Sequence, residues 1–180
     1  MMKIPSLKIP SLNPPSMKIP IRYLPFGLST KDSKKQVQML KKSRYQYKKG
    51  KYFTRKQVPS FHSRSSKHLG HAQKIYGLEK ITPSKELAKA TGCSIDALNQ
   101  IVKKGEGAYF SSGSRPNQTA QSWGYARLAS ALTSGKAASI DYNILEKGCN
   151  HKGKAFTLAK KARKAYGFGH GKTKRRIIHK

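Results

Sequence analysis

The residues of this chain best suited to chemistry are tyrosines and cations that alternate in one run, Tyr45-Gln-Tyr-Lys-Lys-Gly-Lys-Tyr-Phe-Thr-Arg-Lys56. Aromatic rings can stack on nucleobases while ammonium and guanidinium groups neutralise phosphates. A tyrosine-rich surface that faces another protein has the same composition. We expect contacts with a partner or with phosphate from this run and from a second basic group near the C-terminus: Arg44, Tyr45, Tyr47, Lys48, Lys49, Lys51, Tyr52, Arg55, Lys56, Lys172, Lys174, Arg175 and Arg176.

A second polar group lies between residues 105 and 135, where glycines, serines and Pro116 predict a loop for the first half of the segment. Its side chains could clasp an anion. They could equally satisfy one another and the loop backbone, and local bonding of this kind is the favoured interpretation. The residues concerned are Ser112, Ser114, Arg115, Asn117 and Gln118.

No catalytic constellation is recognisable, so we expect neither an enzyme nor a cofactor. The seven carboxylates are scattered, without a close pair suited to acid–base work. The segment Gly167-Phe-Gly-His-Gly-Lys-Thr173 imitates a phosphate-binding loop, but its spacing is one residue short and only seven residues follow it. The alternative is a nuclease that uses dispersed Asp, His and Lys.

The histidines and cysteines predict no metal site. His68 and His71 are three residues apart, but without a nearby acid or cysteine a solvated helix face is favoured. The chain has two cysteines, Cys93 and Cys149, whereas disulfide-stapled secreted domains usually have four or more. A bridge between them is the alternative, disfavoured because disulfides are rare in reducing compartments.

The elements that carry these residues differ sharply in charge. The 180 residues have a net charge of +31. Residues 33–78 contain 13 Lys and Arg and residues 147–180 contain 12, and neither segment contains Asp or Glu. Residues 79–146 are close to neutral, with eight basic and six acidic residues. The charge therefore flanks a more ordinary middle, and it predicts a large anionic partner.

The N-terminal segment carries proline at every fifth position from Pro5 to Pro25. This spacing excludes a helix or a central strand and predicts an extended arm. The arm either docks apolar side chains into grooves on neighbouring proteins or is a disordered tail with a mild repeat. The docking side chains would be Ile4, Leu7, Ile9, Leu12, Met17, Ile19 and Ile21.

Apolar spacing and capping residues predict three helices. They are expected over residues 29–49 with Ser29 as the cap, over residues 66–76 with Ser65 as the cap, and in a segment that follows Thr119 as the cap. Residues 84–104 predict a helix-turn-helix-like hairpin with its turn at Gly92. Its inner face would hold Leu87, Ile95, Leu98 and Ile101. If the hairpin read DNA, its groove-facing residues would be Asp96, Ala97, Asn99, Gln100 and Lys103. A hairpin that only packs a core is favoured, because this region lacks excess positive charge.

We therefore predict a mainly α protein, a small helical domain that contains the hairpin, with an extended Pro-repeat arm and a flexible basic C-terminal tail. The expected segments are the arm at 1–28, a basic helix with the aromatic-basic run at 29–64, the helical domain at 65–147 and the tail at 148–180. The sequence contains no apolar window long enough to span a membrane and no secretory signal, which favours an intracellular chain.

Residues 22–149 resemble an uncharacterised domain that is widespread in nucleocytoplasmic large DNA viruses. The resemblance rests on Lys104-Gly-Glu-Gly-Ala-Tyr-Phe-Ser-Ser-Gly-Ser-Arg-Pro-Asn-Gln-Thr119, on Ser122-Trp-Gly-Tyr-Ala-Arg-Leu-Ala-Ser130 and on Gly135-Lys-Ala-Ala138. The whole chain looks like a minor capsid protein of an algal large DNA virus. The proline repeat lies outside the shared region.

This resemblance, together with the charge, leads to the expected function. We expect a minor capsid or virion structural protein, made in the host cell, that bridges neighbouring capsid components from the inner face of the shell. Its expected partners are major and other minor capsid proteins within a large assembly, with packaged DNA or inner-membrane headgroups as further anionic contacts. The alternative is a basic DNA-binding protein that condenses or packages the viral genome.

Overall fold

The computed structural model describes residues 17–169 and 173–178. Ile4, Leu7, Ile9 and Leu12 of the expected docking arm, and Lys172 of the basic group, lie outside these residues. The described part is mainly helical, which confirms the predicted class. It contains β1 (Met17–Pro20), the 3-10 helix η1 (Ile21–Tyr23), α1 (Thr30–Lys48), α2 (Lys67–Tyr76), α3 (Lys85–Thr91), α4 (Ile95–Ser111), α5 (Ala120–Leu132), α6 (Lys136–Ile140), α7 (Tyr142–Gly148), α8 (Lys154–Tyr166) and β2 (Arg175–Ile178).

Short polar side chains begin the helices at most of the predicted positions. Ser29, Ser84, Ser94 and Thr119 each accept a hydrogen bond from the backbone N–H three residues ahead, so each satisfies one of the N–H groups that have no partner inside the helix. At α2 the cap is Ser66 rather than the predicted Ser65, and its side chain makes no such bond. The local signals therefore placed the helix starts to within a residue.

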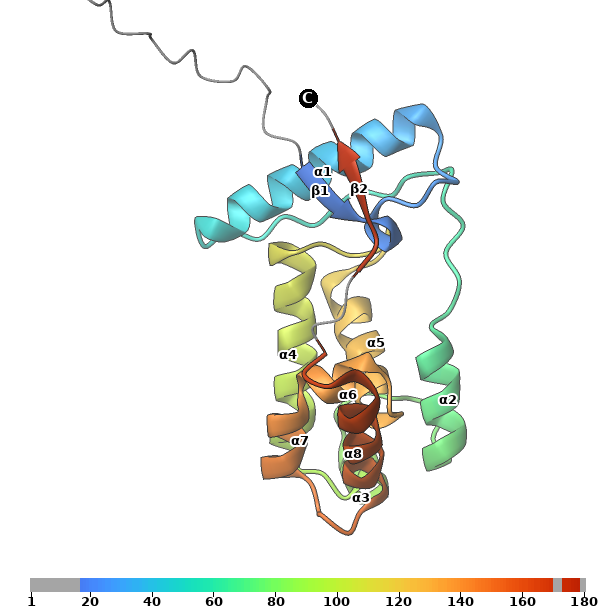
Figure 1. Cartoon of the computed structure of the whole chain (residues 1–180), viewed down its shortest axis with the longest axis vertical. Coiled ribbons are helices and arrows are strands. Elements are labelled where there is room, and N and C mark those ends of the chain that lie inside the picture. The colour runs from blue at the N-terminus through green and yellow to red at the C-terminus, as the bar shows by residue number, and fades with distance from the viewer. Residues whose placement is uncertain (1–16, 170–172, 179–180) are drawn as a thin grey trace, which may run out of the picture.

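The main core is built by α2 to α8. Helices α4 and α5 run side by side along the molecule, with α2 beside α5 and with α3, α6, α7 and α8 gathered at one end (Figure 1). Its fully buried large side chains come from several of these helices and include Leu87, Leu98, Ile101, Leu128, Leu132 and Leu145. The hairpin α3–α4 turns at Gly92 in the left-handed conformation (φ 70°), as predicted.

A second core lies at the opposite end of the molecule, where α1 crosses above the ends of α4 and α5 (Figure 1). It is formed by β1, η1, α1 and the extended segment after α1. Its buried apolar side chains are Ile19, Tyr23, Leu24, Leu28, Val37, Met39, Leu40 and Val58. The basic helix is thus packed on its own small core instead of lying free in solution.

Helix α4 continues through Ser111, so the prediction of a loop for residues 105–111 is wrong. Gly105 in this stretch serves helix packing. A Cβ at position 105 would lie 2.6 Å from the Cα of Gly124 on α5, so this close approach of the two helices requires glycine at position 105. The close α4–α5 contact offsets the roughly 1 kcal/mol that glycine costs in a helix relative to alanine.

The predicted tail at 148–180 is wrong for residues 154–166, which form α8. Ala155, Phe156, Ala159 and Ala162 are buried in the main core, while the lysines of α8 point outward. The small apolar side chains recur at helical spacing. Because alanine is only weakly hydrophobic and the segment is rich in lysine, this amphipathic pattern is not apparent from the sequence.

The two strands bring distant parts of the chain together. Strand β2 pairs antiparallel with β1, with Ile19 opposite Arg176. Ile19 has no exposed surface, so it packs within its own chain and is not the docking residue that we expected. Met17 and Ile21 are half-buried at the same place.

Candidate interaction surface

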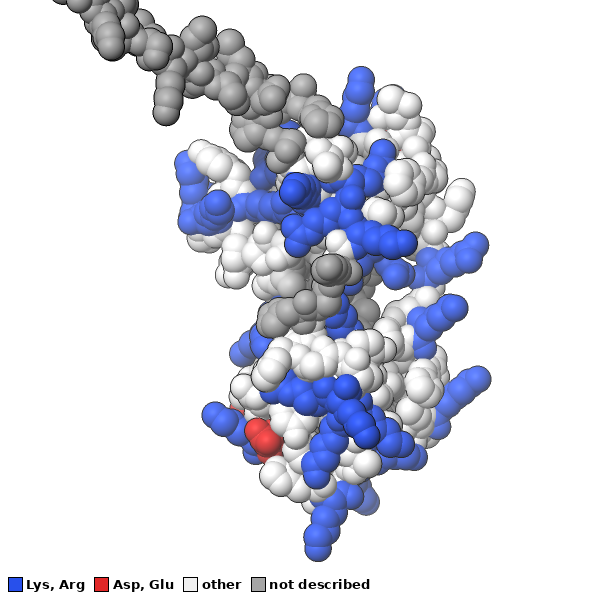
Figure 2. Space-filling model, viewed as in Figure 1, with Lys and Arg blue, Asp and Glu red and all other residues white. Residues whose placement is uncertain are grey.

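The exposed acidic side chains all come from one segment of the chain. Asp32 and Asp141 are buried, and the other five carboxylates lie between Glu79 and Glu146. In the described ranges, residues 17–78 and 147–178 therefore present no exposed carboxylate. Lys and Arg spread over both ends of the face shown in Figure 2, while Asp and Glu appear at one edge only. The surface is suited to a polyanionic partner.

Three aromatic rings meet beside the C-terminal end of α1, and we call Tyr47, Tyr52 and Phe110 the aromatic platform. Tyr47 and Phe110 are nearly parallel, with 7° between the ring planes and 6.4 Å between the centroids. Tyr52 lies 4.9 Å from Phe110 and 6.1 Å from Tyr47. Tyr52 is 72% exposed and Tyr47 37% exposed. The predicted run thus supplies two of the three rings.

The sequence did not identify Phe110, because residues 105–111 are predicted as a loop. The helix instead continues past Lys104 and places Phe110 in the last turn of α4. The alternation of small and large residues in this stretch is the signal that could have indicated a helix. The platform joins three parts of the chain: α1, the segment after it and the end of α4.

Exposed lysines lie close in sequence to the two tyrosines of the platform. Lys48, Lys49, Lys51 and Lys56 are all exposed. The Lys49 ammonium lies 4.4 Å from the ring centroid of Tyr45, itself 57% exposed. These residues stand on the surface, where the prediction placed them.

Arg55 is a structural residue and not the partner contact that we expected. It is 8% exposed. Its guanidinium donates to the Ser43 hydroxyl, the Tyr109 carbonyl and the Ser114 hydroxyl and lies 3.7 Å from the Tyr109 ring centroid. Burial lowers the pKa of Arg55 from its usual value, but an arginine pKa starts so high that the group stays charged at neutral pH.

Arg44, also expected at the surface, is half-buried. Its guanidinium donates two hydrogen bonds to the Ser112 carbonyl, at 3.2 and 2.7 Å. Burial is the main cause that lowers its pKa. Arg44 therefore ties α1 to the end of α4.

The polar loop satisfies its own chain. Ser114 is buried and bonded to Arg55, and the Asn117 side chain accepts from the Val58 N–H and donates to the carbonyls of Val58 and Phe61. Gln118 accepts from the Ser122 hydroxyl. In this group only Arg115 and Ser112 have exposed side chains, which agrees with the favoured interpretation of local bonding.

The face of α4 that would read DNA is partly covered. Ala97 is buried, and a Cβ on Gly148 at the end of α7 would lie 2.3 Å from the Ala97 Cβ. Gln100 donates to Asp96 at 2.6 Å. Asn99 and Lys103 instead line an open hollow with Thr82 and Tyr125. Ile95, expected inside the hairpin, is 38% exposed. The hairpin packs a core, and its predicted groove-facing set does not form one free face.

The remaining basic residues near the C-terminus are split. Lys174 and Arg175 are exposed, whereas Arg176 is half-buried. The Arg176 guanidinium lies 4.6 Å from the ring centroid of Phe26 and donates to the Leu24 carbonyl. Arg176 thus connects β2 to the second core.

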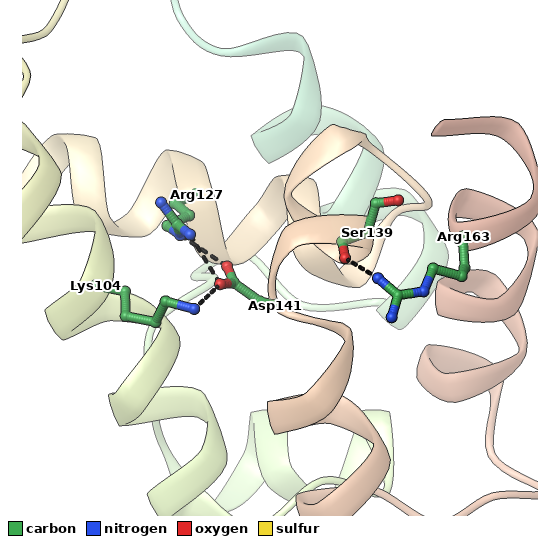
Figure 3. A network of polar contacts seen from close by, with 5 residues as sticks. All are labelled: Lys104, Arg127, Ser139, Asp141 and Arg163. Carbon is green, nitrogen blue, oxygen red and sulfur yellow. Dashed lines mark hydrogen bonds and ion pairs between the residues drawn. The ribbon is translucent and has the colours of Figure 1, made fainter. Parts of the chain in front are cut away.

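One ionic network lies inside the molecule (Figure 3). The Asp141 carboxylate, whose side chain has no exposed surface, accepts two hydrogen bonds from Arg127, at 2.7 and 2.8 Å, and pairs with Lys104 at 2.7 Å. Lys104 belongs to α4, Arg127 to α5 and Asp141 to the junction of α6 and α7. Nearby, Arg163 of α8 donates to the Ser139 carbonyl. The network holds four helices in register and has the geometry of a structural group.

Cys93 and Cys149 form a disulfide, so our expectation of unbridged cysteines is wrong. The two residues meet because Gly92 and Ser94 hydrogen-bond across to Asn150 and Gly148, and this pairing places the thiols side by side. The rarity of disulfides in reducing compartments, on which the prediction was based, carries no information about this contact.

Among the described residues, no three His, Cys, Asp or Glu side chains come together in a way that could hold a metal ion. His68 lies beside Thr133, and burial is the main cause that lowers its pKa. No helix of the described part is both long enough and apolar enough to cross a membrane.

A family model described as a family of unknown function (DUF5824) matches residues 20–146. Neither the curated proteins nor the solved structures contain a match to this chain. The family match spans the buried residues of the second core except Ile19, the aromatic platform and helices α1 to α6.

Proposed function

Because the chain belongs to the family of unknown function DUF5824, we propose its role from its own surface: it is a minor capsid protein that bridges neighbouring virion components from the inner face of the shell. One observation carries the proposal. All exposed carboxylates of the described residues lie between Glu79 and Glu146 in the sequence, and the described segments before and after them expose Lys and Arg without any exposed Asp or Glu. The resemblance of residues 22–149 to proteins of large DNA viruses supports the viral setting.

In this proposal the bridging arm is the sequence that precedes β1, since Ile19, Tyr23 and Leu24 are buried in the second core and are not available to a neighbour. The sequence before β1 contains Ile4, Leu7, Ile9 and Leu12 between regularly spaced prolines, a pattern suited to grooves on another protein. The basic flanks would meet acidic surfaces of those neighbours.

Deletion of residues 2–16 is therefore expected to abolish incorporation into particles while leaving the fold intact, because every described residue of both cores is kept. Quantitative mass spectrometry of purified particles measures incorporation, and circular dichroism measures the fold. A matched variant keeps every proline and lysine but changes Ile4, Leu7, Ile9 and Leu12 to serine, and it should fail in the same way. Wild-type copy number for the truncated chain in particles would contradict the bridging role.

A second candidate function, condensation of the packaged genome, is favoured by the outward lysines of α8. Lys160, Lys161 and Lys164 are exposed on a helix that carries no acid. Duplex binding should weaken with salt, and the slope of log K against log salt changes by about 0.9 for each phosphate contact. Replacing these three lysines with glutamine should then reduce the slope by about 2.7.

The matched control for this test replaces Lys80, Lys85 and Lys89 with glutamine, since these lie among the carboxylates of the middle segment. It removes the same charge and should change the slope less. Absence of duplex binding at moderate ionic strength, or equal effects of the two triple variants, would rule out condensation through α8.

A further inference from the structure

The aromatic platform leaves large ring surfaces in solvent. Tyr52 is 72% exposed although its ring lies within 4.9 Å of Phe110. Exposed apolar groups that gather in one place usually mark an interaction site. Platform rings come from segments more than 50 residues apart in the sequence, so the fold itself assembles the cluster.

The Phe110 ring of the platform packs on a buried tyrosine. The Phe110 ring packs edge-on against Tyr109, with 4.9 Å between centroids and 87° between planes. Tyr109 is fully buried, its hydroxyl accepts from the Arg55 N–H, and its ring faces the Arg55 guanidinium. Rings on a fixed base lose little conformational freedom on binding, which favours affinity.

The rim of the platform is cationic. Lys48, Lys49 and Lys51 are exposed on both sides of the turn at Gly50, and residues 33–78 contain no carboxylate. Glu106, one turn before Phe110 on α4, lines the hollow with Thr82 and Tyr125 and packs towards Gly124. An occupant of this site must therefore offer both flat apolar faces and negative charge.

Unpaired nucleic acid has this combination, because each nucleotide carries one planar base and one phosphate. In a duplex the base faces are covered by their neighbours in the stack, and only phosphates and groove edges remain accessible. We infer that the aromatic platform binds single-stranded nucleic acid by stacking bases on Tyr52 and Tyr47 while Lys48, Lys49 and Lys51 pair with the phosphates. Stacking of this kind tolerates any base sequence. The inference does not depend on the virion role or on duplex condensation.

The test measures binding of a short fluorescein-labelled oligothymidine to the full chain by fluorescence anisotropy. Tyr52→Ala is expected to weaken binding by about 5- to 150-fold, since stacking of one base contributes about 1–3 kcal/mol. Tyr52→Phe should keep wild-type affinity because the ring remains. A fluorescein-labelled duplex of the same length should have the same affinity for Tyr52→Ala as for the wild type, because the lysines are unchanged.

The matched control is Phe168→Ala. Phe168 is 70% exposed and its ring centroid lies 4.2 Å from the Arg163 guanidinium, in the segment that follows α8 and outside the platform. Its removal should leave oligothymidine affinity unchanged. Equal loss in both variants, unchanged binding by Tyr52→Ala, or absence of single-strand binding by the wild type would overturn the inference. Failure of Tyr52→Ala to enter particles, with oligothymidine binding intact, would also overturn it and assign the platform to a protein partner.

Discussion

Arg127→Met is expected to lower the free energy of unfolding by about 3–5 kcal/mol, the cost of leaving a buried charge without its partner. The Asp141 side chain has no exposed surface, whereas Arg127 is 18% and Lys104 47% exposed. Arg127 supplies two of the three charged contacts to this carboxylate, at 2.7 and 2.8 Å. Loss of Arg127 therefore leaves a desolvated carboxylate that depends on one flexible lysine.

A double-mutant cycle separates this ionic cost from the loss of packing. Asp141→Asn in the Arg127→Met background removes the stranded charge, so the double variant should be more stable than Arg127→Met alone. Lys104→Met is the matched control and should cost less, because Lys104 is half exposed and makes a single contact. Urea unfolding of the wild type, Arg127→Met, Asp141→Asn, the double variant and Lys104→Met gives the free energies. A loss below about 1 kcal/mol for Arg127→Met, or strict additivity, would show that the network contributes little to stability.

Reduction of the Cys93–Cys149 disulfide is expected to destabilise the chain by about 4 kcal/mol, the chain-entropy value for a loop closed across a separation of 56 residues. The bridge ties the α3–α4 turn to the end of α7, two places otherwise joined by backbone hydrogen bonds of 2.7 Å. Opening it restores conformational freedom mainly to the unfolded chain, so the folded contacts should survive.

Urea unfolding with and without a phosphine reductant measures this effect, and thiol alkylation followed by mass spectrometry verifies the redox state. The variant with both cysteines changed to serine is the control. It should unfold like the reduced wild type and ignore the reductant, because the chain has no further cysteine. An unfolding midpoint of the wild type that does not respond to reduction would contradict the structural role of the bridge.

Helix starts could be predicted because they depend on local chemistry. The hydroxyls of Ser29, Ser84, Ser94 and Thr119 each bond an N–H only three residues away, and no distant contact is needed to satisfy it. The turn at Gly92 is equally local. Where the sequence reasoning failed, a local signal had two meanings. Gly105 suggests a loop by its flexibility, but here it allows a helix to approach Gly124.

The candidate surface, too, could be predicted from the sequence only in part. The run Tyr45–Lys56 identified the exposed lysines and two rings of the platform, but it also included Arg55, which is buried against Tyr109. Nothing within the run distinguishes Arg55 from Lys56. The distinction arises from Ser43, Tyr109 and Ser114, which surround the guanidinium from other parts of the chain.

The sequence by itself determined the helical class, the starts of α1 to α5 to within a residue and the separation of two basic segments from a near-neutral middle, because these follow from composition and from neighbours within a few residues. Only the tertiary structure decided that α8 belongs to the main core, that Cys93 meets Cys149 and that Phe110 completes the aromatic platform. Arg176 and Leu24, 152 residues apart, are joined by one hydrogen bond. Such contacts depend on the path of the whole chain, since packing brings together groups that local preferences cannot relate.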